Sequence, residues 1–79
     1  MTHEFYSNVW IPSNDDFMLL VTPRIPLEDK PIIQVYHYRD GNRNLPAILI
    51  SVKQIHYLEV ANLITIISTT PFDGYVVVK

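Results

Sequence analysis

Hydrophobic and polar residues alternate along several short segments of the chain. Phe17, Leu19 and Val21 share one face of a predicted strand. Ile25 continues this face, and the residues at 33–36 alternate in the same way. A repeat of two residues is the period at which side chains of a β-strand return to the same face. These segments therefore predict strands that turn one face to a core.

Turn-forming residues separate the predicted strands. They occur as clusters of Pro, Gly, Asn and Asp at residues 12–15, 26–29, 40–42 and 71–74. These residue types accept the dihedral angles of turns, and their repetition at short intervals is typical of hairpins. We expect one all-β domain over residues 1–79, a small antiparallel meander of about six or seven short strands that forms a barrel or a sandwich. The six prolines disfavour long helices.

The segment 51–63 allows two interpretations. Ser51 followed three residues later by Gln54 fits a helix capping box, and the apolar residues after it recur at helical spacing. As a hairpin, the same segment pairs with the apolar run "LITIIS" across a turn at residues 61–62, and its His, Tyr and Val favour a strand. We favour the hairpin. A helix at about 51–63 would instead make the protein α+β.

One family resemblance falls in the same region. Residues 50–69, "ISVKQIHYLEVANLITIIST", resemble the opening strands of LytTR-type DNA-binding domains, where an Ile-X-Tyr-Leu/Ile-Glu run precedes a short apolar strand. The resemblance implies strands in this segment. Such a domain would continue beyond "FDGYVVVK", and the shared residues are common in strands, so no residue roles are transferred from it.

Some of the apolar runs do not alternate. They are residues 47–50, 63–67 and 75–78. A strand that is apolar on both sides requires cover on both faces, which we expect either from a closed monomeric barrel or from a layer supplied by another chain. The second alternative predicts a homo-oligomer or an obligate partner surface, with contacts from Ile64, Ile66, Val76 and Val78. The absence of lysine between Lys53 and Lys79 favours it, because edge lysines discourage strand addition.

Composition narrows the classes of function. A formal net charge of −2 with 18% charged residues argues against binding that depends on neutralising phosphates. The chain has no cysteine for a thiolate metal site, and its two glycines cannot form a phosphate-binding loop. The histidines at positions 3, 37 and 56 are isolated, and the aspartates lie in turns. We therefore expect no catalytic residue, cofactor, metal or small-molecule substrate, and we predict that the protein is not an enzyme.

The stretch "QVYHYRDGNRN", residues 34–44, is the most site-like part of the chain. Tyrosine and arginine are enriched at the centre of protein interfaces, so we predict a partner-binding surface. Its residues are Tyr36, Tyr38, Arg39, Arg43 and Tyr57. Cross-strand aromatic packing, with Tyr57 opposite, explains the same residues without any partner. Trp10 likewise allows a core position or a binding hot spot, and we favour the core.

The residues together predict a small protein-interaction or assembly module that self-associates or binds a protein partner through apolar strands. The alternative is a single-stranded nucleic-acid-binding barrel in which Tyr36 and Tyr38 stack on bases and Arg43 reaches a phosphate. The N-terminal segment lacks the features of a signal peptide, and no apolar stretch has the length of a membrane span, so we expect a cytoplasmic protein. The small size also suits a virus-encoded or phage-encoded structural or host-blocking protein.

Overall fold

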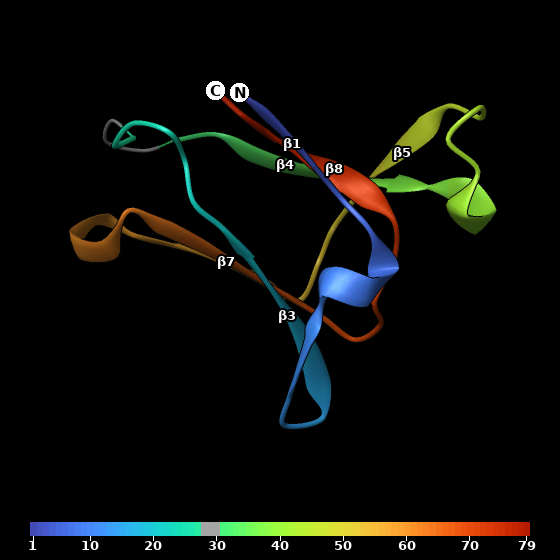
Figure 1. The fold of residues 1–79 in the computed structure, drawn as a ribbon, viewed down its shortest axis with the longest axis horizontal. Helices are drawn as coiled ribbons and strands as arrows, with labels where there is room; N and C mark the ends of the chain where they lie inside the picture. The colour runs from blue at the N-terminus through green and yellow to red at the C-terminus, as the bar shows by residue number, and fades with distance from the viewer. Residues whose placement is uncertain (28–30) are drawn as a thin grey trace.

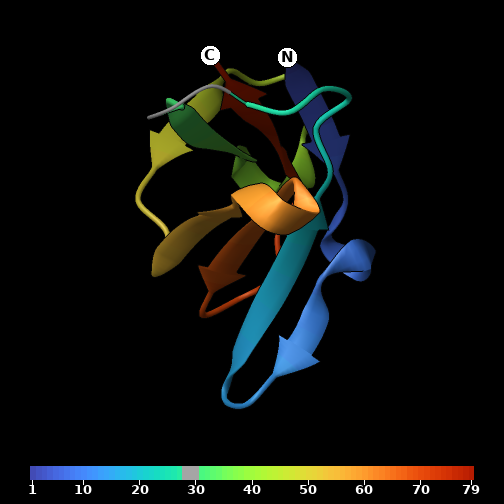
Figure 2. The same ribbon diagram turned by 90° about the vertical axis from the view of Figure 1, so that its left-hand side faces the viewer.

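The computed structural model describes residues 1–27 and 31–79 and contains two four-stranded antiparallel sheets. The sheets lie one above the other, as Figure 1 and Figure 2 show from two sides. Within the described residues the only helical turns are three short 3-10 helices, at Ser7–Val9, Arg39–Gly41 and Glu59–Ala61. The predicted all-β class is therefore confirmed, as a sandwich of eight strands. The expected turn at 26–29 extends outside the described residues.

Sheet A contains both ends of the described chain. Its strands, in spatial order, are β1 (Thr2–Phe5), β8 (Gly74–Val78), β4 (Ile33–Tyr38) and β5 (Ala47–Ile50). Because β8 lies between β1 and β4, the segment nearest the C-terminus is a central strand. The two chain ends lie side by side in Figure 1, and the Met1 ammonium group donates a hydrogen bond to the Val78 carbonyl oxygen.

Sheet B is formed from the chain segments between those of sheet A. Its strands, in spatial order, are β2 (Ile11–Ser13), β3 (Asp16–Val21), β7 (Leu63–Ser68) and β6 (Gln54–Leu58). Only β2–β3 and β6–β7 here, and β4–β5 in sheet A, are neighbours in both sequence and space. The strand order therefore departs from the expected meander, since β1–β8, β4–β8 and β3–β7 pair segments far apart in the chain.

The segment 51–63 forms a hairpin, and the helical alternative is wrong. β6 pairs with β7 in a register that places Leu58 opposite Leu63. Asn62 has a φ of 48° in the left-handed region, which asparagine accepts more readily than most residues. The residues at 59–61 form a 3-10 turn instead of continuing β6.

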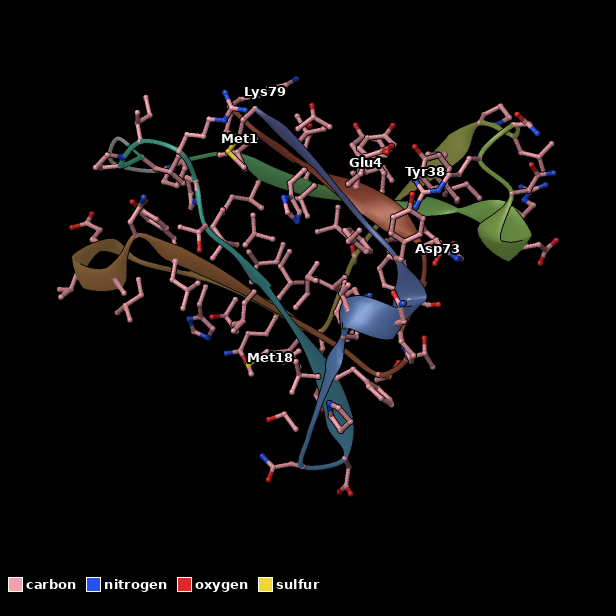
Figure 3. All side chains as sticks on the ribbon, in the orientation of Figure 1. Met1, Glu4, Met18, Tyr38, Asp73 and Lys79 are labelled. Atoms are coloured by element: carbon pink, nitrogen blue, oxygen red, sulfur yellow. The ribbon has the colours of Figure 1, made fainter. Side chains whose placement is uncertain are left out.

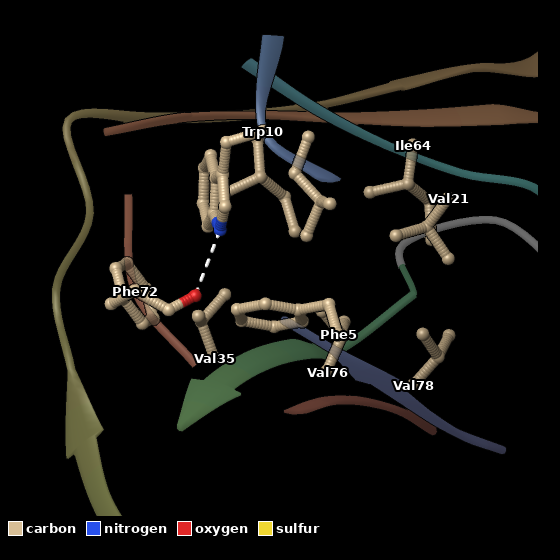
Figure 4. Close-up of a cluster of buried hydrophobic side chains, with 10 residues drawn as sticks. Phe5, Trp10, Val21, Val35, Ile64, Phe72, Val76 and Val78 are labelled. Atoms are coloured by element: carbon tan, nitrogen blue, oxygen red, sulfur yellow. Dashed lines mark hydrogen bonds between the residues drawn. The ribbon is translucent and has the colours of Figure 1, made fainter. Parts of the chain in front are cut away.

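The core lies between the sheets, and three aromatic rings pack together within it (Figure 4). Phe5 meets the rings of Trp10 and Phe72 edge to face, each at a centroid distance of 5.4 Å. The Trp10 indole nitrogen donates a 2.9 Å hydrogen bond to the Phe72 carbonyl oxygen, so its one polar atom has a partner. The expected core position of Trp10 is confirmed. Phe17, Leu19 and Val21 also face inward as predicted, but Ile25 lies beyond β3 and is 72% exposed.

The apolar runs of β7 and β8 find their second layer within the same chain. Ile64, Ile66, Val76 and Val78 are buried between the sheets, at 4% exposure or less. Their side chains are therefore not available as the external contacts expected from the sequence. The physical reason is that eight short strands suffice to build two layers, so each central strand turns one face to the other sheet.

Candidate functional site

Three tyrosines lie together on the outer face of sheet A, and we call this group the tyrosine face. Tyr36 and Tyr38 project from β4, and Tyr75 projects from β8 beside Tyr36. The rings of Tyr36 and Tyr75 stack at 4.8 Å with an angle of 17°, and Tyr38 lies 5.6 Å from Tyr75. The cross-strand packing considered from the sequence is present, but its partner is Tyr75 instead of Tyr57.

Tyr57 belongs to the other sheet and does not join the tyrosine face. Its hydroxyl accepts a hydrogen bond from the Leu27 backbone N–H and donates one to Asn62 Oδ1. The Asn62 side-chain amide in turn donates to the Pro23 carbonyl oxygen. Tyr57 therefore holds the loop after β3 against the β6–β7 turn, which is a structural role.

Arg43 is held against the tyrosine face by several contacts at once (Figure 3 labels Glu4 and Tyr38 there). Its guanidinium carbon lies 4.2 Å from the centre of the Tyr6 ring and 4.6 Å from that of Tyr38. One terminal nitrogen donates a 3.1 Å hydrogen bond to the Phe5 carbonyl oxygen, and the other lies 3.4 Å from Glu4 Oε1. Arg43 thus joins the loop after β4 to β1.

Glu4 also binds Tyr38, and this contact affects the titration of the phenol. The Tyr38 hydroxyl donates a 2.7 Å hydrogen bond to Glu4 Oε1. This bond, followed by desolvation and by the negative charge of Glu4, raises the pKa of Tyr38 above its ordinary value. Arg39 is exposed, and its side chain has no hydrogen-bond or ion-pair partner within residues 1–27 and 31–79. The structure therefore brings together Tyr36, Tyr38 and Arg43 of the predicted set.

Strand β5 lies at a free edge of sheet A. The backbone hydrogen bonds of β4 show which backbone groups of β5 point away from the sheet. Ile32 and Lys79 exchange two backbone bonds, and the Tyr38 N–H donates to the Asp73 carbonyl oxygen. Because such bonds alternate along an antiparallel strand, the even-numbered residues of β4 bond to β8 and the odd-numbered ones bond to β5. Ile48 and Ile50 face these odd-numbered residues, so the N–H and C=O groups of Ala47 and Leu49 point away from the sheet.

No strand among the described residues covers this edge, and its side chains are apolar. Leu49 is 54% exposed and lies beside Tyr36 on the outer face, while Ile48 is 40% exposed. A groove of about 600 Å³ runs from β5 to the edge of β6 below it. Its apolar lining comes from Ile33, Val35, Leu49, Ile50, Val52 and Ile55. Its polar lining comes from Gln34, Ser51, Lys53 and Gln54.

The edges of β1 and β2 carry features that discourage strand addition, and β6 is more polar than β5. The outward backbone groups of β1 include those of Glu4, since the Met1–Val78 bonds turn the odd-numbered residues toward β8. β2 spans three residues and contains Pro12, and β6 contains Gln54 and His56. The run "AILI" of β5 does not alternate, and neither do the buried runs of β7 and β8. Only the position of β5 at an edge of the sheet distinguishes it from them.

The described residues hold no group of three or more His, Cys, Asp or Glu side chains that could bind a metal ion. Across residues 1–27 and 31–79, no helix has the length and apolar character of a membrane span. Comparison with known proteins gives no match, whether to a family model, to a curated protein or to a solved structure.

Proposed function

We propose that this domain is a protein-interaction module that binds an extended protein segment along the free edge of β5. One observation carries the proposal: an uncharged apolar strand presents outward backbone groups directly beside a groove of mixed apolar and polar lining. Main-chain hydrogen bonds supply affinity in strand addition, and pockets for alternate side chains supply specificity.

The two faces of the edge would contact alternate side chains of the bound segment. Residues of the segment that point outward would extend the row formed by Tyr75, Tyr36 and Leu49. Those that point inward would enter the groove above Val52 and Ile55. The segment would be extended and apolar at alternate positions, because β5 itself offers no charged side chain.

The contacts of Arg43 do not favour the nucleic-acid alternative. A phosphate would have to compete with Glu4 and with the Phe5 carbonyl oxygen for the guanidinium group. Tyr36 and Tyr75 also stack on each other, which occupies one face of each ring that a base would need. The cytoplasmic location and the viral or phage origin expected from the sequence both stay predictions.

Amide hydrogen exchange in the presence of a probe peptide tests the proposal. The probe is an uncharged peptide of seven residues that alternates valine and threonine. When nine-tenths of the protein is bound to peptide, exchange of the Leu49 amide should slow by about tenfold. The reason is that this amide then exchanges only in the one-tenth of the molecules that are free. The Ile48 amide, which faces β4, should change little.

A matched pair of lysine variants provides the control. Leu49→Lys introduces a charge at the edge of β5 and should weaken peptide binding. Leu58→Lys makes the same change at a position of equal exposure, 55% against 54%, on β6. Equal peptide binding by the two variants, or protection of β6 amides instead of Leu49, would refute binding at β5.

A further inference from the structure

The side chains and outward backbone groups of β5 are arranged so that two copies of this edge can pair with each other. We infer that the extended segment bound there is β5 of a second copy of this chain, added antiparallel so that two copies of sheet A form one continuous sheet. This inference rests on the proposed function and specifies the partner.

The direction of the backbone groups restricts the register of such a pair. A two-fold axis perpendicular to the sheet places residues of the same face opposite each other. With the axis at Leu49, this residue faces Leu49 of the second copy, and the two exchange N–H and C=O bonds through groups that already point outward. Ala47 then faces Ser51 of the second copy, and this pair is also a hydrogen-bonded pair of the antiparallel ladder.

The side chains that meet in this register carry no charge. On the outer face, the row Tyr75, Tyr36, Leu49 continues directly into the same row of the second copy. On the inner face, Ile48 lies opposite Ile50 of the second copy, and Ile50 is one of the residues that line the groove. Self-pairing thus brings no like charges together, whereas pairing of two β1 edges would bring the Glu4 carboxylates close together.

The size of the contact indicates its strength. β5 has four residues, so its pairing buries less than the roughly 1,200 Å² at which stable interfaces begin. We therefore expect a reversible dimer whose population rises with protein concentration.

Single-cysteine variants test this register, because the natural chain contains no cysteine. Facing residues of a bonded antiparallel pair have Cα atoms about 5.5 Å apart, which lies within the range for disulfides. Leu49→Cys should form a disulfide-linked dimer under mild oxidation, and Leu58→Cys, with equal exposure, should remain monomeric. Light scattering across a dilution series should show the mass rising above 9.2 kDa in the natural protein. Leu49→Lys should raise the dimer dissociation constant by at least about tenfold.

The outcomes separate the two proposals. A constant mass of 9.2 kDa and no crosslink at position 49 would overturn self-pairing. If the valine–threonine peptide still protected the Leu49 amide in that case, the strand-binding function would stand with another partner. A dimer that persists in Leu49→Lys, or that crosslinks equally through position 58, would also overturn the inference, since another surface would then form the contact. Loss of both self-pairing and peptide protection would remove both proposals.

Discussion

The indole nitrogen of Trp10 and the carbonyl oxygen of Phe72 are joined by a buried hydrogen bond of 2.9 Å that connects the two sheets. Trp10 directly precedes β2 of sheet B, and Phe72 lies in the loop that leads into β8 of sheet A. The two rings also pack at a centroid distance of 5.0 Å. This contact joins two of the connections by which the chain passes between the sheets, β1 to β2 and β7 to β8.

Replacing Trp10 by phenylalanine should lower the free energy of unfolding by about 1–3 kcal/mol, because the Phe72 carbonyl oxygen is left buried without its donor. Urea unfolding followed by circular dichroism measures the change. Leu58→Ala, at an exposed site, serves as the control and should stay within about 0.5 kcal/mol of the natural protein. A Trp10→Phe variant as stable as this control would show that the bond contributes nothing.

Alanine at the two glycines should have unequal effects. A Cβ on Gly74 would collide with the carbonyl oxygen of Tyr36, so Gly74→Ala requires β4 and β8 to separate and should cost about 3 kcal/mol or more. Gly41 has a φ of +67°, but a Cβ there meets Asp73 only at 3.5 Å. Gly41→Ala should cost about 1 kcal/mol from backbone strain. Thermal or urea unfolding compares the two, and equal losses would contradict the close approach at Gly74.

Stability should fall at high pH through Tyr38. Its pKa is raised in the folded state, chiefly by the hydrogen bond to Glu4, so the folded state holds the phenol proton more tightly than the unfolded state. The resulting stabilisation is complete below the unfolded pKa of about 10 and is lost as the pH rises through the folded value. Unfolding measured between about pH 9 and about pH 11 should therefore be less pH-dependent in Tyr38→Phe. An identical pH dependence in the two proteins would exclude this role.

Proline substitutions should distinguish the two sides of β5. The Ile48 N–H faces β4, so Ile48→Pro removes a bond of the sheet, whereas the Leu49 N–H points outward. Leu49→Pro should therefore be more stable than Ile48→Pro, by about 1–3 kcal/mol in urea unfolding. Equal destabilisation would contradict the assigned direction of the free backbone groups.

The local pattern of the sequence predicted the strands that have one apolar face. β3 and β4 alternate as expected, and the hairpin of β6 and β7 follows from strand-forming residues on both sides of Asn62. In the N-terminal segment, a 3-10 turn at Ser7–Val9 separates Phe5 from Trp10. That turn lets both aromatic side chains enter the core.

The partners of the strands could not be predicted, because they depend on contacts between distant segments. Tyr36 meets Tyr75 only because β8 enters between β1 and β4. The same insertion makes β8 a buried central strand and leaves the similar run at β5 on an edge. Apolar composition alone does not distinguish these two positions. The contacts expected of Ile64, Ile66, Val76 and Val78 therefore fall on buried residues, whereas Ile48 and Leu49 of β5 are exposed.

The central place of β8 has a consequence for synthesis of the protein. β1 leaves the ribosome before β8, its partner in sheet A, and most of the described chain lies between the two strands. Sheet A cannot be completed until residues 74–78 have emerged from the ribosome, so β1 has no partner strand in sheet A before then. Such a nascent chain would depend on its speed of translation, or on a chaperone, to avoid aggregation before the last strand arrives.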